Sequence, residues 1–231
     1  MSIRFLTLDG LTPYIAARDL QLELVEKRIR DEIPDTVLFL EHAPTITRGR
    51  GLQFTGEPRA EKQIPLTQPL PENTEYHDSE RGGDLTWHGP GQLVIYPIIK
   101  LTSHDLNTYI RFLEQIIIDE LLTLKIPATR KPNASGVWVG EKKLASLGIA
   151  VRRWVTYHGI ALNLTNSLEG FHLITPCGYS PEVMARVVDY HPQANRADFE
   201  SRLVRRWSAQ SVGFDLQKNQ LHSKNGRSFP A

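Results

Sequence analysis

Cys177 is the only cysteine in this chain of 231 residues, so it has no disulfide partner within the chain. It could be a small buried packing residue or a thiol that takes part in chemistry. Its neighbours favour the second interpretation, because Gly178 leaves the backbone uncrowded and Ser180-Pro181-Glu182 has the pattern of a helix start. The positive end of such a helix would stabilise a thiolate, and a nearby lysine would do so more strongly. We therefore expect Cys177 to be a reactive thiol.

A second stretch that could do chemistry is glycine-rich and begins Arg81-Gly82-Gly83-Asp84-Leu85-Thr86-Trp87-His88-Gly89-Pro90-Gly91-Gln92. It lacks the spacing and the following Lys-Ser/Thr of a phosphate-binding P-loop. No second His or Cys stands at the spacing of zinc ligands. Glycines allow a backbone to approach a ligand closely. Polar and aromatic side chains in so tight a loop therefore favour the wall of a ligand site over a plain glycine-rich hairpin.

Two shorter features have purely structural explanations as well as functional ones. The segment Thr47-Arg48-Gly49-Arg50-Gly51 could offer backbone N–H groups and guanidinium groups to an anion. It could equally be a solvated turn. His158 stands close to the start of a predicted strand, where a lone histidine is more often a structural residue with its hydrogen bonds satisfied.

Strands must position these residues. Alternating apolar residues predict strands at 136–139, 143–151 and 157–164, the first two joined by a turn at 140–142. Small residues share a face of the last two strands: Ser146, Gly148 and Ala150 with Leu144 on one, and Gly159, Ala161 and Asn163 on the other. Strand interiors use glycine where something must approach closely. We therefore expect a slot between these strands.

The rest of the chain mixes helices with strands. Apolar spacing predicts helices at 11–30, 105–125 and 199–210, with Leu106 on the buried face of the second and Arg202, Arg205 and Arg206 outward on the third. Further strands are predicted at 3–8, 36–40 and 93–99. Residues 53–73 are rich in Pro, Gly and polar side chains, which predicts a long loop. The length fits a single domain over residues 1–217, followed by a polar, frayed tail at 218–231.

Composition excludes some classes of function. The formal net charge is +1, which gives no case for bulk nucleic-acid binding. The N-terminus lacks a basic region followed by a long apolar stretch, so we expect no signal peptide. The longest apolar run, around Ile116 to Ile118, is broken by Asp119 and Glu120 and is too short to span a bilayer. A lone thiol without an export signal predicts a cytoplasmic protein.

Three segments together resemble one family. Arg81-Gly82-Gly83-x-x-Thr86-Trp87-His88-x-x-Gly91-Gln92-x-x-x-Tyr96 resembles the signature of the lipoyl(octanoyl) transferases, the LipB family. Lys143-Leu144-Ala145-Ser146-Leu147-Gly148 resembles the lysine segment of that family, and Pro176-Cys177-Gly178 resembles its cysteine segment. His158-Gly159-x-Ala161-Leu162-Asn163 falls where the family has such a strand. The resemblance runs from Glu41 to Val187 in the family's order.

The resemblance implies an α/β domain with α+β character, in which helices flank a mixed β-sheet, similar to the catalytic domains of lipoate ligases and biotin protein ligases. It implies transfer of an octanoyl or lipoyl group, as the first step of endogenous protein lipoylation. The donor would be octanoyl-acyl carrier protein. The acceptors would be lipoyl domains of 2-oxoacid dehydrogenase E2 subunits and the glycine cleavage H protein. Neither cofactor nor metal is expected, and neither nucleic acid nor a membrane is an expected partner.

The resemblance also implies roles for individual residues. Cys177 would be the nucleophile that forms an acyl thioester, and Lys143 would lower its pKa and shuttle protons. This agrees with the chemistry, because a thiolate is both a nucleophile and a leaving group, and one lysine can favour the thiolate and then act as a base. His158 and Tyr96 would support the site. The acyl chain would be lined by Arg81, Gly82, Gly83, Asp84, Leu85, Thr86, Trp87, His88, Ser146, Leu147, Gly148, Gly159, Ile160 and Ala161.

Two alternatives and one surface remain open. An ATP-dependent lipoate-protein ligase would share the fold but would not need Cys177, and Arg48-Gly49-Arg50-Gly51 loosely resembles the basic glycine loop of biotin ligases. A non-enzymatic acyl-binding scaffold would keep the pocket and leave the lysine and cysteine unexplained. Acyl carrier proteins and lipoyl domains are typically acidic, so Arg48, Arg50, Arg152 and Arg153 are candidates for a docking rim, or for a solvated face.

Overall fold

The computed structural model describes residues 3–52, 66–132, 134–176 and 179–211. Its main sheet has seven strands, of which β1 and β2 are parallel and all other neighbours antiparallel, so the sheet is mixed as predicted. In spatial order the strands are β1 (Arg4–Thr12), β2 (Thr36–His42), β6 (Gln92–Ile98), β10 (Val155–Asn163), β9 (Lys142–Arg152), β8 (Ala134–Val139) and β7 (Thr129–Lys131).

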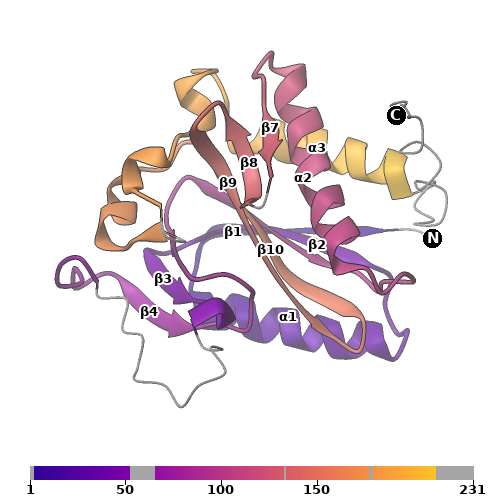
Figure 1. The fold of residues 1–231 in the computed structure, drawn as a ribbon. Coiled ribbons are helices and arrows are strands. Elements are labelled where there is room, and N and C mark those ends of the chain that lie inside the picture. The colour runs from indigo at the N-terminus through magenta and orange to yellow at the C-terminus, as the bar shows by residue number, and fades with distance from the viewer. Residues whose placement is uncertain (1–2, 53–65, 133, 177–178, 212–231) are drawn as a thin grey trace, which may run out of the picture.

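Helices cover both faces of the main sheet (Figure 1). One face is covered by α1 (Tyr14–Ile29), and the other by α2 (Leu106–Thr123) and α3 (Arg196–Ser211). The larger core cluster includes Ile117 of α2 and Phe199 of α3, and the smaller one includes Val25 of α1. The carboxylate of Asp105 accepts a hydrogen bond from the Thr108 N–H and so caps the start of α2. None of the helices in the described ranges is long and apolar enough to cross a membrane.

Apart from the helix predicted to start at Ser180, the predicted helices and strands are present, and their ends differ by a few residues. Some of the faces expected to be buried or exposed were predicted wrongly. Leu106 is 37% exposed, whereas the α2 residues Glu114 and Glu120 are buried. Glu120 is buried because Arg206 of α3 donates to it at 3.3 Å and Arg202 lies 3.7 Å away. Arg202 and Arg206 therefore contact α2 instead of pointing outward. Apolar spacing does not detect a buried carboxylate whose partner comes from a distant helix.

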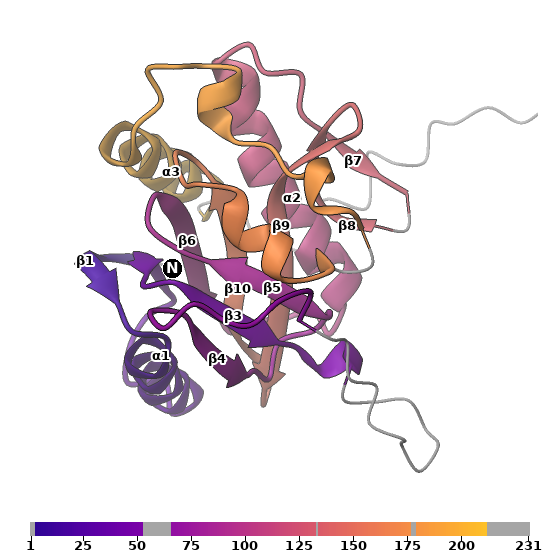
Figure 2. The ribbon, with the colours of Figure 1, turned by 90° about the vertical axis from the view of Figure 1, so that its left-hand side faces the viewer.

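A second, smaller sheet was not predicted from the sequence. Its strands are β4 (Glu75–Asp78), β3 (Thr45–Arg48) and β5 (Leu85–His88), in that order, and Figure 2 shows them beside the main sheet. Each has four residues and is flanked by loop-forming residues, so the sequence favoured loops there. The single-turn 3₁₀ helices η1 (Arg50–Leu52) and η2 (Glu169–Leu173) lie in the connections. Buried Ile46, Trp87 and Phe171 hold η2 against this sheet.

The helix predicted to start at Ser180 is only one 3₁₀ turn, η4 (Pro181–Val183). The Ser180 side chain makes no capping hydrogen bond. A second short turn follows as η5 (Val187–Asp189). A turn of three residues has no aligned row of peptide dipoles, and the dipole effect depends on such a row. The prediction that a helix N-terminus activates Cys177 is therefore wrong, and Cys177 and Gly178 themselves lie outside the described residues.

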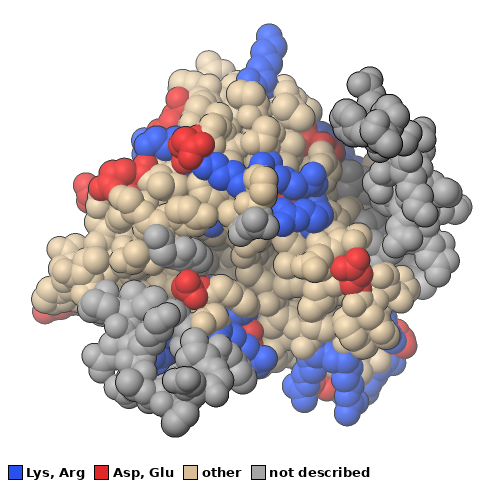
Figure 3. Space-filling view, in the orientation of Figure 1, with Lys and Arg blue, Asp and Glu red and all other residues tan. Residues whose placement is uncertain are grey.

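Basic side chains gather in a stripe on the face shown in Figure 3, over β7, β8 and the adjacent part of α2. In the docking rim predicted from the sequence, by contrast, two of the four arginines are in ion pairs. Arg48 forms an ion pair with Asp78 at 2.7 Å, and Arg152 forms one with Glu26 at 2.8 Å. These pairs favour the solvated-face interpretation for Arg48 and Arg152.

Candidate functional site

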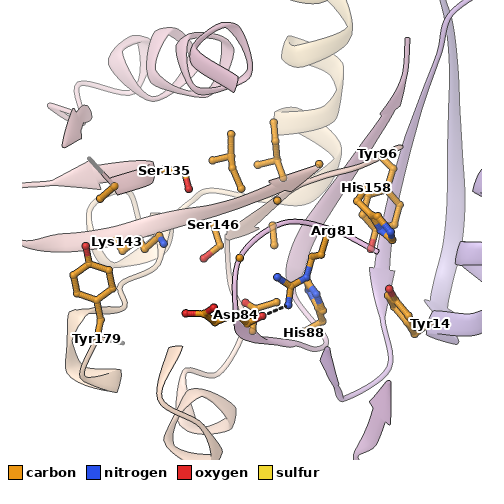
Figure 4. A pocket seen from close by; sticks show the side chains of 18 residues that line it. Tyr14, Arg81, Asp84, His88, Tyr96, Ser135, Lys143, Ser146, His158 and Tyr179 are labelled. Carbon is orange, nitrogen blue, oxygen red and sulfur yellow. Dashed lines mark hydrogen bonds between the residues drawn. The ribbon is translucent and has the colours of Figure 1, made fainter. Parts of the chain in front are cut away.

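A cavity of about 230 Å³ lies between strands β9 and β10 and the loop that precedes β5 (Figure 4). Since a water molecule takes up about 30 Å³ of liquid, the cavity holds roughly eight groups of that size. This volume suits an acyl chain of medium length. Its lining residues are Tyr14, Arg81, Gly83, Asp84, Thr86, His88, Tyr96, Ala134, Ser135, Lys143, Ser146, Leu147, Gly148, His158, Gly159, Ile160, Ala161 and Tyr179.

Small residues of β9 and β10 lie side by side in the cavity wall. Gly148 pairs with Gly159, and Ser146 pairs with Ala161. A Cβ atom on Gly148 would stand 2.9 Å from the Gly82 carbonyl oxygen and 3.2 Å from the Arg81 Cδ. Gly148 is thus needed so that the loop before β5 can approach the sheet closely, where the Gly82 N–H donates to the Ile149 carbonyl at 2.9 Å. The same approach closes one side of the cavity.

A β-bulge brings Lys143 to the cavity. The β8–β9 register shifts between Val137 and Trp138. Lys143 therefore lines the cavity, whereas Leu144 packs in the larger core cluster. The prediction that Leu144 shares a face with Ser146 and Gly148 is wrong, because strict alternation does not allow for a bulge.

The loop that carries Arg81 is held rigidly by backbone contacts. The N–H groups of Gly49, Arg50 and Gly51 donate to the carbonyls of Asp84, Arg81 and Gly83, at 3.0, 2.8 and 2.9 Å. These N–H groups are used within the protein, so they are not an anion site. The Arg81 guanidinium donates to the Thr47 side chain and to the carbonyls of Thr47 and Asp84. A buried cation is thereby fixed midway along the cavity (Figure 4).

The outer end of the cavity is aromatic and carries an ammonium group. Lys143 is only 4% exposed. Its Nζ lies 5.4 Å from the ring centroid of Trp138 and 5.9 Å from that of Tyr179. The Tyr179 N–H donates to the Pro176 carbonyl at 3.0 Å. Lys143 thus lies beside Tyr179, which follows Cys177 by two residues, although Lys143 is far from both in sequence.

The inner end of the cavity is buried and built from hydrogen-bonded rings. Tyr14, Tyr96 and His158 line it and are at most 4% exposed. The Tyr96 hydroxyl and the His42 Nε2 are 2.8 Å apart, and the Nδ1 of the same histidine lies 2.9 Å from the Thr12 carbonyl. His158 has a left-handed backbone, φ +55°, and its N–H donates to the Gln21 side chain at 2.7 Å. The bend at His158 thereby ties the inner end of the cavity to α1.

Burial keeps the histidines around this end neutral. Loss of hydration lowers the pKa of His42 to about 4 and the pKa of His88 well below its usual value. It also lowers the pKa of His158, although Glu80 opposes that shift. The pKa of Glu80 is lowered by its hydrogen bond with His158 and by a bidentate contact with Arg18. Near neutral pH these histidines hold the shape of the site and carry no charge.

Of the predicted lining residues, Gly82, Leu85 and Trp87 do not line the cavity. Trp87 packs instead on Phe171, with ring centroids 5.5 Å apart. The slot is not purely apolar, since Arg81, His88 and His158 lie in its wall. The cavity brings together the other predicted lining residues, Lys143, Tyr96 and His158, while Cys177 lies outside the described residues. Their roles stay predictions.

The sequence analysis missed lining residues at both ends of the cavity. Tyr14 falls within the helix predicted at 11–30, but nothing in the sequence assigned it to the site. Ala134, Ser135 and Tyr179 stand next to segments that the sequence did single out. Only the position of Tyr179, two residues after Cys177, was a usable signal. In the part of the chain that the structure describes, no three His, Cys, Asp or Glu side chains are grouped to hold a metal ion.

Comparison with known proteins agrees with the resemblance seen in the sequence. The lipoyl protein ligase A/B catalytic domain family matches residues 13–208. An octanoyltransferase of Gloeobacter violaceus is 43% identical over 178 residues, which is 75% of each chain. An octanoyltransferase of Syntrophobacter fumaroxidans is 45% identical over 181 residues, again 75% of each chain. An octanoyltransferase of Nostoc sp. is 36% identical over 210 residues, which is 90% of this chain and 91% of the relative.

Solved structures of lipoate ligases share the fold. The crystal structure of lipoate-protein ligase A bound with ATP has a TM-score of 0.70 at 17% identity, covering 92% of this chain and 86% of that one. Protein Ta0514 of T. acidophilum has a TM-score of 0.68 at 18% identity, with the same coverage. The predicted mixed α/β domain is thus confirmed. With relatives that are transferases over most of its length, the chain is an acyltransferase, and it belongs to the octanoyltransferases of the lipoyl protein ligase A/B catalytic domain family.

Proposed function

We propose that the protein moves an octanoyl or lipoyl group from acyl carrier protein to a lysine of a lipoyl domain, through an acyl thioester on Cys177. The acceptors would be E2 subunits of 2-oxoacid dehydrogenases and the glycine cleavage H protein. One observation carries the proposal. Buried Lys143 stands at the outer end of a cavity of acyl size, beside Tyr179, which follows Cys177 by two residues.

The reaction would proceed in two balanced steps. In the first, the Cys177 thiolate attacks the carbonyl carbon of the donor thioester, and the carrier's thiol leaves with the proton given up by the cysteine. In the second, the acceptor lysine amine attacks the enzyme thioester, an amide forms, and the cysteine sulfur leaves as a thiolate. Lys143 as ammonium would stabilise the thiolate in both steps, and as amine it would accept the proton of the incoming lysine.

The walls of the cavity are compatible with binding of the acyl chain. The glycine and alanine pairs of β9 and β10 leave room for a chain. Arg81 and the loop around it close the opposite side. Burying roughly six methylenes there would contribute on the order of 5 kcal/mol to acyl binding, at about 0.8 kcal/mol each. Because η4 is only one 3₁₀ turn, Lys143 becomes the main source of thiolate stabilisation in this proposal among the described residues.

We further propose that Arg111, Arg130, Lys131 and Lys142 form a basic docking rim for the acidic carrier protein. They belong to α2, to β7 and to the start of β9, and Figure 3 shows a stripe of basic side chains over this part of the molecule. Lys131 pairs across the ladder with Ala134, and Lys142 precedes Lys143, so both flank lining residues. Lys131 also forms an ion pair with the exposed Glu141 at 2.5 Å, so the net charge of the rim rests on Lys142 and the arginine pair. Arg111 and Arg130 share the single buried carboxylate of Glu114, at 2.7 and 3.1 Å. The arginine pair therefore keeps a net positive charge in a fixed place.

Intact-protein mass spectrometry tests the main proposal. The enzyme is incubated with octanoyl-acyl carrier protein in the absence of ATP and weighed. We expect one octanoyl adduct on the wild type, mapped to Cys177 and removed by hydroxylamine, and none on Cys177→Ser. Addition of a lipoyl domain should then move the octanoyl group to the acceptor lysine.

The same experiment separates the alternatives. A lipoate-protein ligase would modify the lipoyl domain only with ATP and free octanoate, and Cys177→Ser would retain that activity. A binding scaffold would gain no covalent adduct under either condition. Either result would overturn the thioester mechanism.

A further inference from the structure

Trp138 lies at the junction of the segments that meet at the outer end of the cavity. The Lys143 Nζ is 5.4 Å from its ring centroid. The Tyr179 ring meets it edge-on, with centroids 5.4 Å apart and planes at 67°. The Lys131 Nζ lies over the same ring at 4.4 Å. One indole therefore contacts Lys143, Tyr179 and Lys131, which belongs to the basic docking rim.

The indole N–H does not explain why this residue is buried here. Trp138 is fully buried, yet its Nε1 makes no hydrogen bond within the described ranges. A buried donor without a partner is destabilising, so a residue chosen for packing alone would more simply be phenylalanine or leucine. The ring face supplies what those residues offer weakly or not at all, since the indole is the best cation–π partner among the side chains.

The backbone around Trp138 is shaped to admit the lysine. Gly136 has φ +138°, and a Cβ atom there would lie 2.6 Å from the Lys143 Cε and 3.3 Å from the Trp138 Nε1. The N–H of Gly136 donates at 3.0 Å to Glu114, a fully buried carboxylate of α2. α2 thus fixes the strand segment that seats both side chains.

From these contacts, and resting on the proposed function, we infer that Trp138 is a positioning residue that holds the Lys143 ammonium beside Tyr179, two residues after the proposed nucleophile Cys177. Its ring limits the rotamers of a side chain that has four rotatable bonds. It also packs edge-on against Tyr179. Without the ring, Lys143 would keep its charge but would no longer be held in this place beside Tyr179.

Two variants test the inference, with two readouts. Trp138→Leu removes the ring, and Trp138→Phe keeps a smaller ring without the unpaired N–H. The first readout is the pH dependence of Cys177 alkylation by iodoacetamide. The second is the rate of octanoyl-adduct formation from a small octanoyl thioester, which bypasses the docking rim. The matched control is Trp154→Leu at the β9–β10 turn, away from the cavity.

In Trp138→Leu, we expect alkylation to shift to higher pH and adduct formation to fall about 5- to 30-fold, the range that a desolvated cation–π contact corresponds to. Trp138→Phe should lose only a few-fold, and Trp154→Leu should match the wild type. Should Trp138→Leu fail to fold, Tyr179→Leu serves in its place, because it removes the second, only partly buried ring beside Lys143. It should shift the pH dependence of alkylation in the same direction by a smaller amount.

Unchanged alkylation curves and adduct rates in Trp138→Leu would overturn the inference. Equal losses in Trp138→Leu and Trp138→Phe would also overturn it, since they would assign the effect to packing by the whole indole. Alkylation does not depend on acyl transfer. A wild type that forms no adduct but still shows the Trp138-dependent alkylation shift would therefore sink the proposed function and leave this inference standing.

Discussion

The two ends of the cavity are built on opposite principles. The outer end holds the Lys143 side chain beside the aromatic rings of Trp138 and Tyr179. The inner end holds Tyr96 and His158 in hydrogen bonds to neutral or fully paired groups. Figure 4 shows Lys143 and Tyr179 on one side of Arg81, and Tyr96 and His158 on the other. In the proposed mechanism the outer end changes its charge, whereas the buried inner end keeps its shape.

The two ends should serve different functions: the outer end sets the rate of the chemical steps, and the inner end selects the acyl chain. A group that exchanges a proton in each turnover needs a pKa within reach of the working pH. A wall that measures chain length needs rigid atoms, and deep burial with hydrogen bonds such as that of Tyr96 to His42 provides them. Substitutions at the outer end should therefore change the chemical steps, and substitutions at the inner end should change stability and acyl selection. Each prediction below tests whether the two ends are separable in this way.

The largest effect is expected at Lys143. Lys143→Ala should slow both half-reactions by about 10²- to 10⁴-fold, the usual contribution of a positioned acid or base. Lys143→Arg should restore part of the first step, because the cation returns, but not the second, because a guanidinium does not give up its proton. Single-turnover measurements of adduct formation and of transfer to a lipoyl domain separate the two steps. Equal recovery of both steps in Lys143→Arg would remove the proton shuttle from the mechanism.

At the inner end, the expected effect is on stability and its pH dependence. The pKa of His42 is about 4 in the folded protein and near 6.5 in an unfolded chain, so the unfolded state binds the extra proton first. His42 therefore contributes stability that is complete above pH 6.5 and is lost as the pH falls towards 4. The loss is on the order of 3 kcal/mol, and His88 and His158 act in the same direction.

Urea unfolding between pH 7 and pH 4.5 measures this slope. In His42→Gln the slope should be smaller than in the wild type, while the rate of adduct formation at pH 7 should change little. A slope that does not change on substitution would show that burial of His42 contributes nothing to acid sensitivity. A large loss of rate at pH 7 would instead break the comparison between the two ends.

Much of the fold was predictable because local patterns decide it. The apolar stripe of α2 and the hairpin of β8 and β9 follow from residues close in sequence. The site could be predicted only as a set of segments. The juxtaposition of Lys143 and Tyr179 depends on a β-bulge and on the path of the chain after β10, and neither leaves a periodic signal. The failed helix at Ser180 shows the same limit, since a good cap sequence does not guarantee continued helical packing.

Between the two ends, Gly148 offers an effect of intermediate size. Even Gly148→Ala would bring a methyl group to 2.9 Å from the Gly82 carbonyl, so the Arg81 loop must move. We expect a loss of about 1–3 kcal/mol in stability, as for overpacking, and a preference for shorter acyl thioesters. The matched control is Gly82→Ala, whose Cβ would meet only the Ile149 carbonyl at 3.8 Å. Thermal unfolding and rates with six-, eight- and ten-carbon thioesters test both claims, and an unaltered length preference in Gly148→Ala would show that the chain lies elsewhere.

The smallest effect concerns docking, which should involve the outer end alone. Lys142 is exposed and its Nζ contacts only a backbone carbonyl, that of Glu182, among the described residues. Lys142→Gln should reduce kcat/KM with octanoyl-acyl carrier protein by a few-fold at low salt, because a rim charge acts mainly on the association rate. The difference should vanish at high ionic strength, where exposed charges are screened.

The control Lys27→Gln removes a charge from α1 that is paired with Glu23 and should have no such effect. Activity with a small octanoyl thioester should be unaffected by either substitution or by salt. Salt could instead slow the reaction with the small thioester as much as the reaction with the carrier protein. That result would show that salt acts on the charge of Lys143 itself and that the docking rim has no part in the reaction.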